Sequence, residues 1–303
     1  MKFKLTPIQQ CFTFLVLMAM GAVGWWVFNM LTTENWATIE KDPLALKIAA
    51  VVLGLSLLVF ILHLAVTLGW AIVLRAIFSK LTGRHKNLED TLITGLILFL
   101  LLNFWNVKAN NGGGLSNQMH LLHALVATTF AMAIKVWGMW KGMPVMNPAV
   151  GGLLLTILLF QSVLGLNAPF ISWWGTDFGG LVSLVLVLGW IVLGLKKWRK
   201  YPLLLSFLVS HAALLFFQEK IDFLTYSFTH STLYFMASIM LIEPKTSPSM
   251  KKDQIGYGIL AAVAYNLFLS LAIPYAELWT IVLTNGFYLL LKMKRMGIES
   301  WKV

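Results

Sequence analysis

The sequence is short of charge and of cysteine. Only 12% of its 303 residues are charged, whereas a soluble domain has about 25%. Cys11 is the one cysteine, so a disulfide scaffold and a cysteine-bound iron–sulfur cluster are excluded. A G-x-G-x-x-G fingerprint for a dinucleotide is also missing. These absences exclude an ordinary soluble enzyme, and they require any pyridine nucleotide or ferredoxin to act through a partner.

Apolar residues and positive charge are what the chain has in excess. Hydrophobic residues make up 59% of it, the mean hydropathy is +0.80, and 23 Lys and Arg against 12 Asp and Glu give a net charge of +11. A nucleic-acid-binding protein carries its positive charge on a water-exposed face, and this composition leaves little such surface. We therefore expect a lipid bilayer as the surroundings and no nucleic-acid partner.

Ten apolar segments approach the length of about 20 residues that a membrane-spanning helix needs. They predict an all-α, multi-pass protein in which residues 1–303 form a single integral membrane domain. The segments are Phe12–Thr32, Lys47–Leu74, Thr91–Val107, Gln118–Gly138, Pro148–Leu166, Gly179–Leu195, Pro202–Phe217, Asp222–Ile242, Ile255–Ile273 and Ala276–Leu291.

The distribution of Lys and Arg gives an independent test of this count, because these residues collect in cytoplasmic loops. Ten spans with both termini in the cytoplasm place all but four of the 23 on the cytoplasmic side, the exceptions being Lys41, Lys47, Lys108 and Lys220. We expect the first segment to be an uncleaved span, because its apolar run of about 20 residues is longer than that of a signal peptide. The expected location is a bacterial cytoplasmic (inner) membrane.

Two connections rich in turn residues frame the predicted cytoplasmic face. Asn147-Pro148 opens the fifth segment, and Thr246-Ser247-Pro248 follows the eighth. Proline in a first helical turn, with Asn or Ser before it, is ordinary helix punctuation. The alternative is that such capped helix ends present amide dipoles to a ligand phosphate or ring. The residues alone leave both interpretations open.

Ionisable residues within or beside the apolar segments are candidates for function. His211 and His230 lie at comparable depth on neighbouring segments, as the axial ligands of a haem would; hydrogen bonding to a neighbouring helix is the simpler interpretation. His120 and His123 share a helical face without a Cys or Glu beside them, so we predict no metal site. Glu243 directly follows an apolar run.

Two environments are open to Glu243. Burial would raise the pKa of its carboxyl and suit it to proton-coupled electron transfer. Pairing with Lys245 or Lys251 would instead make it part of a charged interface.

Three stretches resemble a known family. They are AIKVWGMWKGMPVMNPAVGGLLLT at Ala133–Thr156, SWWG at Ser172–Gly175, and YFMASIMLIEPKTSP at Tyr234–Pro248. The last is similar to a Phe-Met-x-x-(Asp/Glu)-Pro-x-Thr-Ser-Pro pattern. The stretches resemble the RnfD/NqrB family, whose members are membrane proteins of the Rnf electron-transport complex and of the sodium-translocating NADH:quinone reductase. The likeness extends from about Ala133 to the C-terminus.

The resemblance implies a ten-helix core built from two related five-helix halves. It implies a membrane subunit that passes electrons through a flavin, either flavin mononucleotide (FMN) or riboflavin, within a larger complex whose electron flow is linked to ion movement. Other subunits and a soluble electron donor on the cytoplasmic side would be its partners. Members that bind FMN covalently use a Ser-Gly-Ala-Thr motif that this sequence lacks, so the flavin is expected to be noncovalent.

The same resemblance implies the site residues. Glu243 is the expected catalytic residue, and the expected cofactor-binding residues are Lys141, Asn147, Pro148, Trp174, Thr246 and Ser247. Two other functions stay open at this point. One is a transporter or channel without redox chemistry, since the family's fold is similar to that of urea transporters. The other is a haem-binding membrane reductase that uses His211 and His230.

Overall fold

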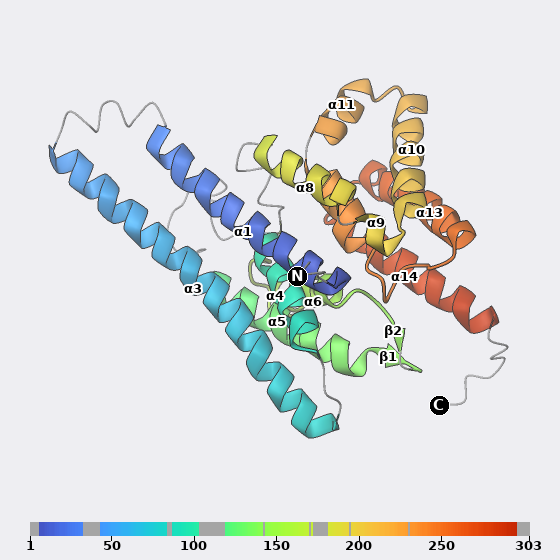
Figure 1. The fold of residues 1–303 in the computed structure, drawn as a ribbon, viewed down its shortest axis with the longest axis horizontal. Helices are drawn as coiled ribbons and strands as arrows, with labels where there is room; N and C mark the ends of the chain where they lie inside the picture. The colour runs from blue at the N-terminus through green and yellow to red at the C-terminus, as the bar shows by residue number, and fades with distance from the viewer. Residues whose placement is uncertain are drawn as a thin grey trace, which may run out of the picture.

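The structure, a computed structural model, describes residues 6–32, 43–83, 87–102, 119–141, 143–169, 171, 181–193, 195–229 and 231–295. These residues are almost entirely helical (Figure 1), which confirms the all-α class for this part of the chain. Two stretches, η3 and η4, are π-helical. In chain order, the helical elements are α1 (Pro7–Thr32), α3 (Pro43–Thr82), α4 (Leu88–Leu101), α5 (His120–Trp137), α6 (Pro148–Ile157), η3 (Leu158–Val163), α8 (Leu181–Leu193), α9 (Leu195–Trp198), α10 (Tyr201–Phe217), α11 (Ile221–Thr229), α12 (Ser231–Phe235), η4 (Met236–Met240), α13 (Lys251–Ser270) and α14 (Ala276–Arg295).

One short hairpin interrupts the helices. Strands β1 (Met139–Trp140) and β2 (Met143–Pro144) pair antiparallel, with Met139 opposite Pro144. Lys141 lies in the turn between them with a φ of 45°, in the left-handed region. The hairpin occupies the glycine- and proline-containing connection that the sequence places between the fourth and fifth segments.

Each predicted segment coincides with one helix or a run of consecutive helices, although several boundaries differ. The helix α3 continues past Leu74, because no helix-breaking residue occurs before Gly83, whose φ of 64° ends it. The segment Pro148–Leu166 changes from α6 to the π-helix η3, and Asp222–Ile242 is divided among α11, α12 and η4. An apolar run predicts burial or membrane contact, but it contains no signal for a change of helix type.

Two helical stretches in the described part of the chain are long and apolar enough to cross a membrane by themselves. They are Ile61–Thr82, within α3, and His120–Trp137, which is α5. Shorter apolar helices include Tyr201–Phe217. The structure therefore supports an association with a membrane, and the ten-span arrangement stays a prediction.

The packing of the helices repeats from the first half of the chain to the second. The helix α3 packs on α5, and five segments later α10 packs on α13; likewise α5 packs on α6 and α13 on α14, and α1 packs on α4 and α8 on α12. The contacts between the halves follow the same spacing, since α1 meets α8 and α6 meets α14. In Figure 1, α3 forms one edge of the molecule, and α10, α11 and α13 gather at the opposite side.

The pairs α10–α13 and α5–α6 approach closely because glycine faces the neighbouring helix. A Cβ at Gly258 would lie 2.6 Å from the carbonyl oxygen of Leu203, and one at Gly152 would lie 2.6 Å from that of Ala127. Neither position has room for a side chain. The resulting buried core includes residues from both halves of the chain.

Candidate functional site

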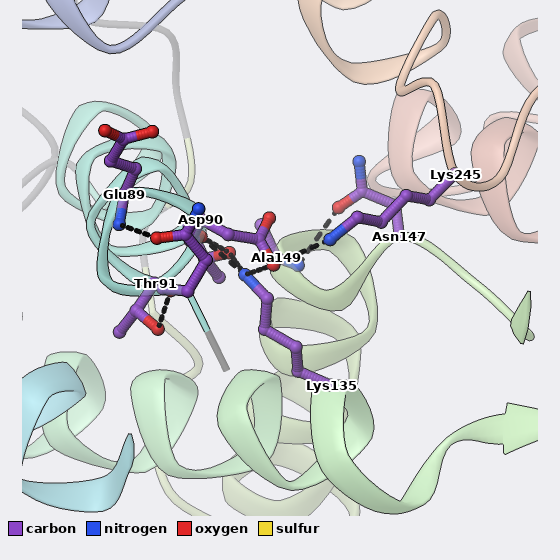
Figure 2. Close-up of polar contacts among 9 residues, drawn as sticks. Glu89, Asp90, Thr91, Lys135, Asn147, Ala149 and Lys245 are labelled. Atoms are coloured by element: carbon purple, nitrogen blue, oxygen red, sulfur yellow. Dashed lines mark hydrogen bonds and ion pairs between the residues drawn. The ribbon is translucent and has the colours of Figure 1, made fainter. Parts of the chain in front are cut away.

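Three charged side chains meet where α4 begins, α5 ends and the loop after η4 passes (Figure 2). The carboxylate oxygen Oδ2 of Asp90 lies 3.1 Å from the Lys135 Nζ and 2.7 Å from the Lys245 Nζ. The Lys135 ammonium also donates to the Thr94 Oγ1 at 2.7 Å and to the backbone carbonyl of Asp90. One carboxylate thus joins three segments that are far apart in the sequence.

The local sequence explains why the three charges are in these positions. Asn87 caps α4, where its side chain accepts from the backbone N–H of Glu89 at 3.3 Å, and Asp90 follows in the first turn. Lys135 lies in the last turn of α5. An acid near a helix N-terminus and a base near a C-terminus are both favoured by the helix dipole. Lys135 is 6% exposed, so its pairing with Asp90 offsets a large desolvation cost.

The two lysines determine the protonation of Asp90. Its partial burial by itself would raise the pKa, but the ammonium groups of Lys135 and Lys245 outweigh this effect, and the pKa is held below its usual value. Asp90 is therefore ionised at neutral pH, with one buried and one half-exposed cation beside it.

Asn147 connects two of the three stretches that carry the family resemblance, Ala133–Thr156 and Tyr234–Pro248. Its Oδ1 caps α6 by accepting from the backbone N–H groups of Ala149 at 3.0 Å and Val150 at 3.2 Å. Its Nδ2 donates to the carbonyl oxygen of Met240 at 3.3 Å, at the end of the π-helix η4. Pro148 occupies the first turn of α6. The punctuation that the sequence suggests is thus present, and the same side chain also forms a contact between distant segments.

A compact turn follows η4. The backbone carbonyl of Glu243 accepts from the N–H of Thr246 at 3.1 Å, the N–H of Ser247 at 2.9 Å and the Ser247 Oγ at 2.8 Å. The Thr246 Oγ1 donates to the Glu243 carboxylate at 3.2 Å. Both Thr246 and Ser247 are buried. We call residues 243–248 the Glu243 turn.

The Glu243 side chain is partly buried, and burial raises its pKa to about 7. Lys135 opposes this shift, Asp90 adds to it, and the Thr246 hydroxyl and Lys245 oppose it further. Of the two environments that the sequence leaves open, burial describes this carboxyl better, because the ion pair of Lys245 is with Asp90. A carboxyl that titrates near neutral pH can exchange protons under physiological conditions.

The remaining predicted site residues are not all brought together. Lys141 is exposed in the β1–β2 turn, with its Nζ 5.4 Å from the centroid of the Trp140 ring. Trp174 and His230 lie outside the described residues, so the predicted haem pair cannot be placed. His211 is fully buried on α10, where its Nδ1 lies 2.8 Å from the Asn266 Nδ2 of α13. This is the contact between helices that the simpler interpretation of this histidine expects.

Sequence reasoning misses three side chains of this region as site residues: Asp90, Lys135 and Lys200, the last of which donates from its Nζ to the Ser247 Oγ of the Glu243 turn at 2.9 Å. In the sequence, Lys200 serves only as an indicator of orientation, and Lys135 serves as one and also lies in the stretch Ala133–Thr156 that resembles the family. Lys135 stands inside an apolar segment, which is an expensive place for a cation and could have marked it. Lys200 has no such signal, because it is one of four basic residues in the stretch 196–200.

In comparisons with known proteins, no protein-family model matches the chain, and no curated protein matches it. Among the residues that the structure describes, no group of three His, Cys, Asp or Glu side chains is placed to hold a metal ion.

Proposed function

We propose that the chain is a membrane subunit of a flavin-dependent electron-transport complex, of the RnfD/NqrB kind found in the Rnf complex and in the sodium-translocating NADH:quinone reductase. One observation carries the proposal. The two described stretches that resemble this family, Ala133–Thr156 and Tyr234–Pro248, come together in space through the hydrogen bond from Asn147 to Met240. Asp90 adds a second link, since it binds Lys135 of one stretch and Lys245 of the other.

The polar contacts between connecting segments support an even number of spans between the two partners of each contact, which is what the ten-span arrangement has. Each of the following pairs joins two segments that this topology places in the cytoplasm: Gln9 with Glu89, Asp90 with Lys245, Lys200 with Ser247, and Asp253 with Arg295. One span more or fewer between any two partners would move one of them to the other face. The repeated packing of α1–α6 in α8–α14 supports two related five-helix halves.

The donor groups decide how a flavin would be held. Asn147, Thr246 and Ser247 use their side chains in bonds within the protein. Thr246 and Ser247 therefore fit the role of shaping the Glu243 turn, and Asn147 that of joining α6 to η4, better than the role of direct ligands. Lys245 is half-exposed and Lys141 exposed, and ammonium groups fit the phosphate of FMN. A bound flavin would supply the electron-transfer chemistry. Glu243 would hold a proton at its carboxyl near neutral pH.

The test is an absorbance spectrum and a mass spectrum of the detergent-purified protein, before and after incubation with FMN or riboflavin. We expect flavin that denaturation releases, with FMN bound more tightly than riboflavin, and we expect Lys245→Met to weaken FMN more than riboflavin. The exposed Lys251→Met is the matched control. A colourless protein that takes up neither flavin would contradict the proposal.

The same preparation separates the two alternative functions. A Soret band that is lost in His211→Ala would indicate a haem protein. Solute flux into proteoliposomes that does not depend on redox state would indicate a transporter or channel.

A further inference from the structure

Lys200 is a buried lysine that has no carboxylate among its hydrogen-bond partners in the part of the chain that the structure describes. It lies between α9 and α10 and is 3% exposed. Its Nζ donates to the Ser247 Oγ at 2.9 Å, to the carbonyl oxygen of Ser247 at 3.3 Å and to that of Pro248 at 2.5 Å. Three oxygens of one turn therefore surround the ammonium, as they would a small cation.

Further hydrogen bonds within the turn connect Lys200 to the Glu243 side chain. The Ser247 hydroxyl accepts from Lys200 and donates its own proton to the carbonyl of Glu243. The same carbonyl closes the turn by accepting the N–H groups of Thr246 and Ser247. Thr246, held in this way, donates to the Glu243 carboxylate.

We propose that Lys200 is a positioning residue for Glu243: its ammonium occupies a cation site formed by oxygens of Ser247 and Pro248 and thereby fixes the Glu243 turn. The inference rests on the proposed function only in taking Glu243 as the residue that holds a proton at the site. The cation site and its effect on that carboxyl are measured without any flavin. An ammonium suits this site because it offers three protons to three acceptors.

The surrounding charges allow this role to be distinguished from a direct charge effect. Lys135, Asp90 and Lys245 are the charges that act on the Glu243 carboxyl, whereas Lys292 is the charge that acts on Lys200. Removing a cation near an acid raises the pKa of the acid. Loosening the turn would let water reach the carboxyl, which lowers that pKa, and would also release the Thr246 hydroxyl, which raises it. Burial is the larger of these two influences on Glu243, so the net result is a fall. The sign of the shift therefore identifies the mechanism.

The first experiment measures the titration of Glu243 and the mobility of its turn. The carboxyl band of Glu243 is taken from infrared difference spectra of each protein against its own Glu243→Gln version, over a range of pH. In Lys200→Met we expect the pKa of Glu243 to fall from about 7 toward the ordinary range, and the amide exchange of Thr246 and Ser247 to become about tenfold faster. Lys251→Met should change neither quantity.

The second experiment is chemical rescue. The Lys200→Ala variant lacks the atoms that n-propylammonium would replace, so this amine should restore both the titration and the exchange rate. Tetramethylammonium carries the same charge without N–H donors and should restore neither. If Lys200→Met fails to fold, Lys200→Ala purified in n-propylammonium and Ser247→Ala provide the same measurements.

The results divide clearly. A lowered Glu243 pKa, with rescue by n-propylammonium alone, supports the proposal. An unchanged or raised pKa, or equal rescue by both cations, overturns it. Absence of flavin with these shifts present would contradict the proposed function and leave the role of Lys200 intact.

Discussion

Lys135 and Lys245 share one carboxylate but differ in exposure. The side chain of Lys135 is 7% exposed and that of Lys245 is 52% exposed. An ion pair in contact with water contributes little, because solvent screens it. A buried ammonium that loses its counter-charge keeps its full desolvation cost. Asp90 thus matters mainly because it neutralises Lys135.

This difference predicts unequal effects of two substitutions. Asp90→Asn should lower the free energy of unfolding by about 3 kcal/mol, whereas Lys245→Met should lower it by less than about 1 kcal/mol. Unfolding in detergent with increasing denaturant measures both. Lys135→Met combined with Asp90→Asn should recover part of the loss. Equal effects of the two single substitutions would show that Lys135 is not the cation that needs Asp90.

The raised pKa of Glu243 predicts a pH dependence of stability with a definite sign. The folded protein holds this proton up to about pH 7, while the unfolded chain releases it near the ordinary glutamate pKa. Between these values the folded state binds more protons, so the contribution of Glu243 to stability falls as the pH rises. Glu243→Gln removes this loss. The free energy of unfolding of Glu243→Gln, relative to that of the unsubstituted protein, should rise by about 2–3 kcal/mol from pH 5 to pH 7. Melting temperatures of the two proteins measured across this range test it, and a difference between them that does not change with pH would contradict the assignment.

At the scale of helices, the approach of α10 to α13 depends on one glycine. Gly258→Ala would place a Cβ 2.6 Å from the Leu203 carbonyl oxygen and 2.9 Å from the Phe207 backbone nitrogen, and backbone atoms cannot move aside as side chains can. We expect a loss of about 1–3 kcal/mol. Gly256, on the same helix, has nothing within 4 Å of its Cβ position. Gly256→Ala should be neutral or stabilising by about 1 kcal/mol, and thermal unfolding of both variants tests the pair.

Asn147 has two roles that two substitutions separate. Asn147→Asp keeps the oxygen that caps α6 and loses the Nδ2 donor to Met240, whereas Asn147→Ala loses both. We expect the alanine variant to be less stable by about 1–2 kcal/mol and the aspartate variant to lie between it and the unsubstituted protein. Denaturant unfolding measures the order. If Asn147→Asp had the same free energy of unfolding as the unsubstituted protein, the hydrogen bond to Met240 would make no contribution to stability.

For the whole molecule, the ten-span topology predicts opposite sides for two exposed positions. In a Cys11→Ser background, Lys251→Cys should react with a membrane-impermeant maleimide only from the cytoplasmic side, and Glu219→Cys only from the outer side. Labelling of intact spheroplasts and inverted vesicles measures this. Reaction of both cysteines from the same side would require an even number of spans between them and would reject the topology.

The helical class and the positions of the segments could be predicted from the sequence, because apolar runs and basic loops follow directly from the cost of placing polar groups in lipid. The cluster around Asp90 could not be predicted in the same way. Asp90, Lys135 and Lys245 are distant in the sequence, and no spacing rule relates them. Glu243 stands out because it adjoins an apolar run, but its partner Thr246 and the supporting Lys200 depend on the folded turn. The π-helices η3 and η4 also had no signal in an apolar sequence.

During synthesis, α10 is complete before its main packing partner α13 exists. Until α13 and the Glu243 turn are made, His211 lacks Asn266 and Lys200 lacks the oxygens of Ser247 and Pro248. A chain interrupted before the Glu243 turn would therefore leave the imidazole of His211 and the ammonium of Lys200 without these partners. Such a fragment would expose polar groups that the complete chain buries, and proteases that degrade unfolded membrane proteins would be expected to remove it quickly.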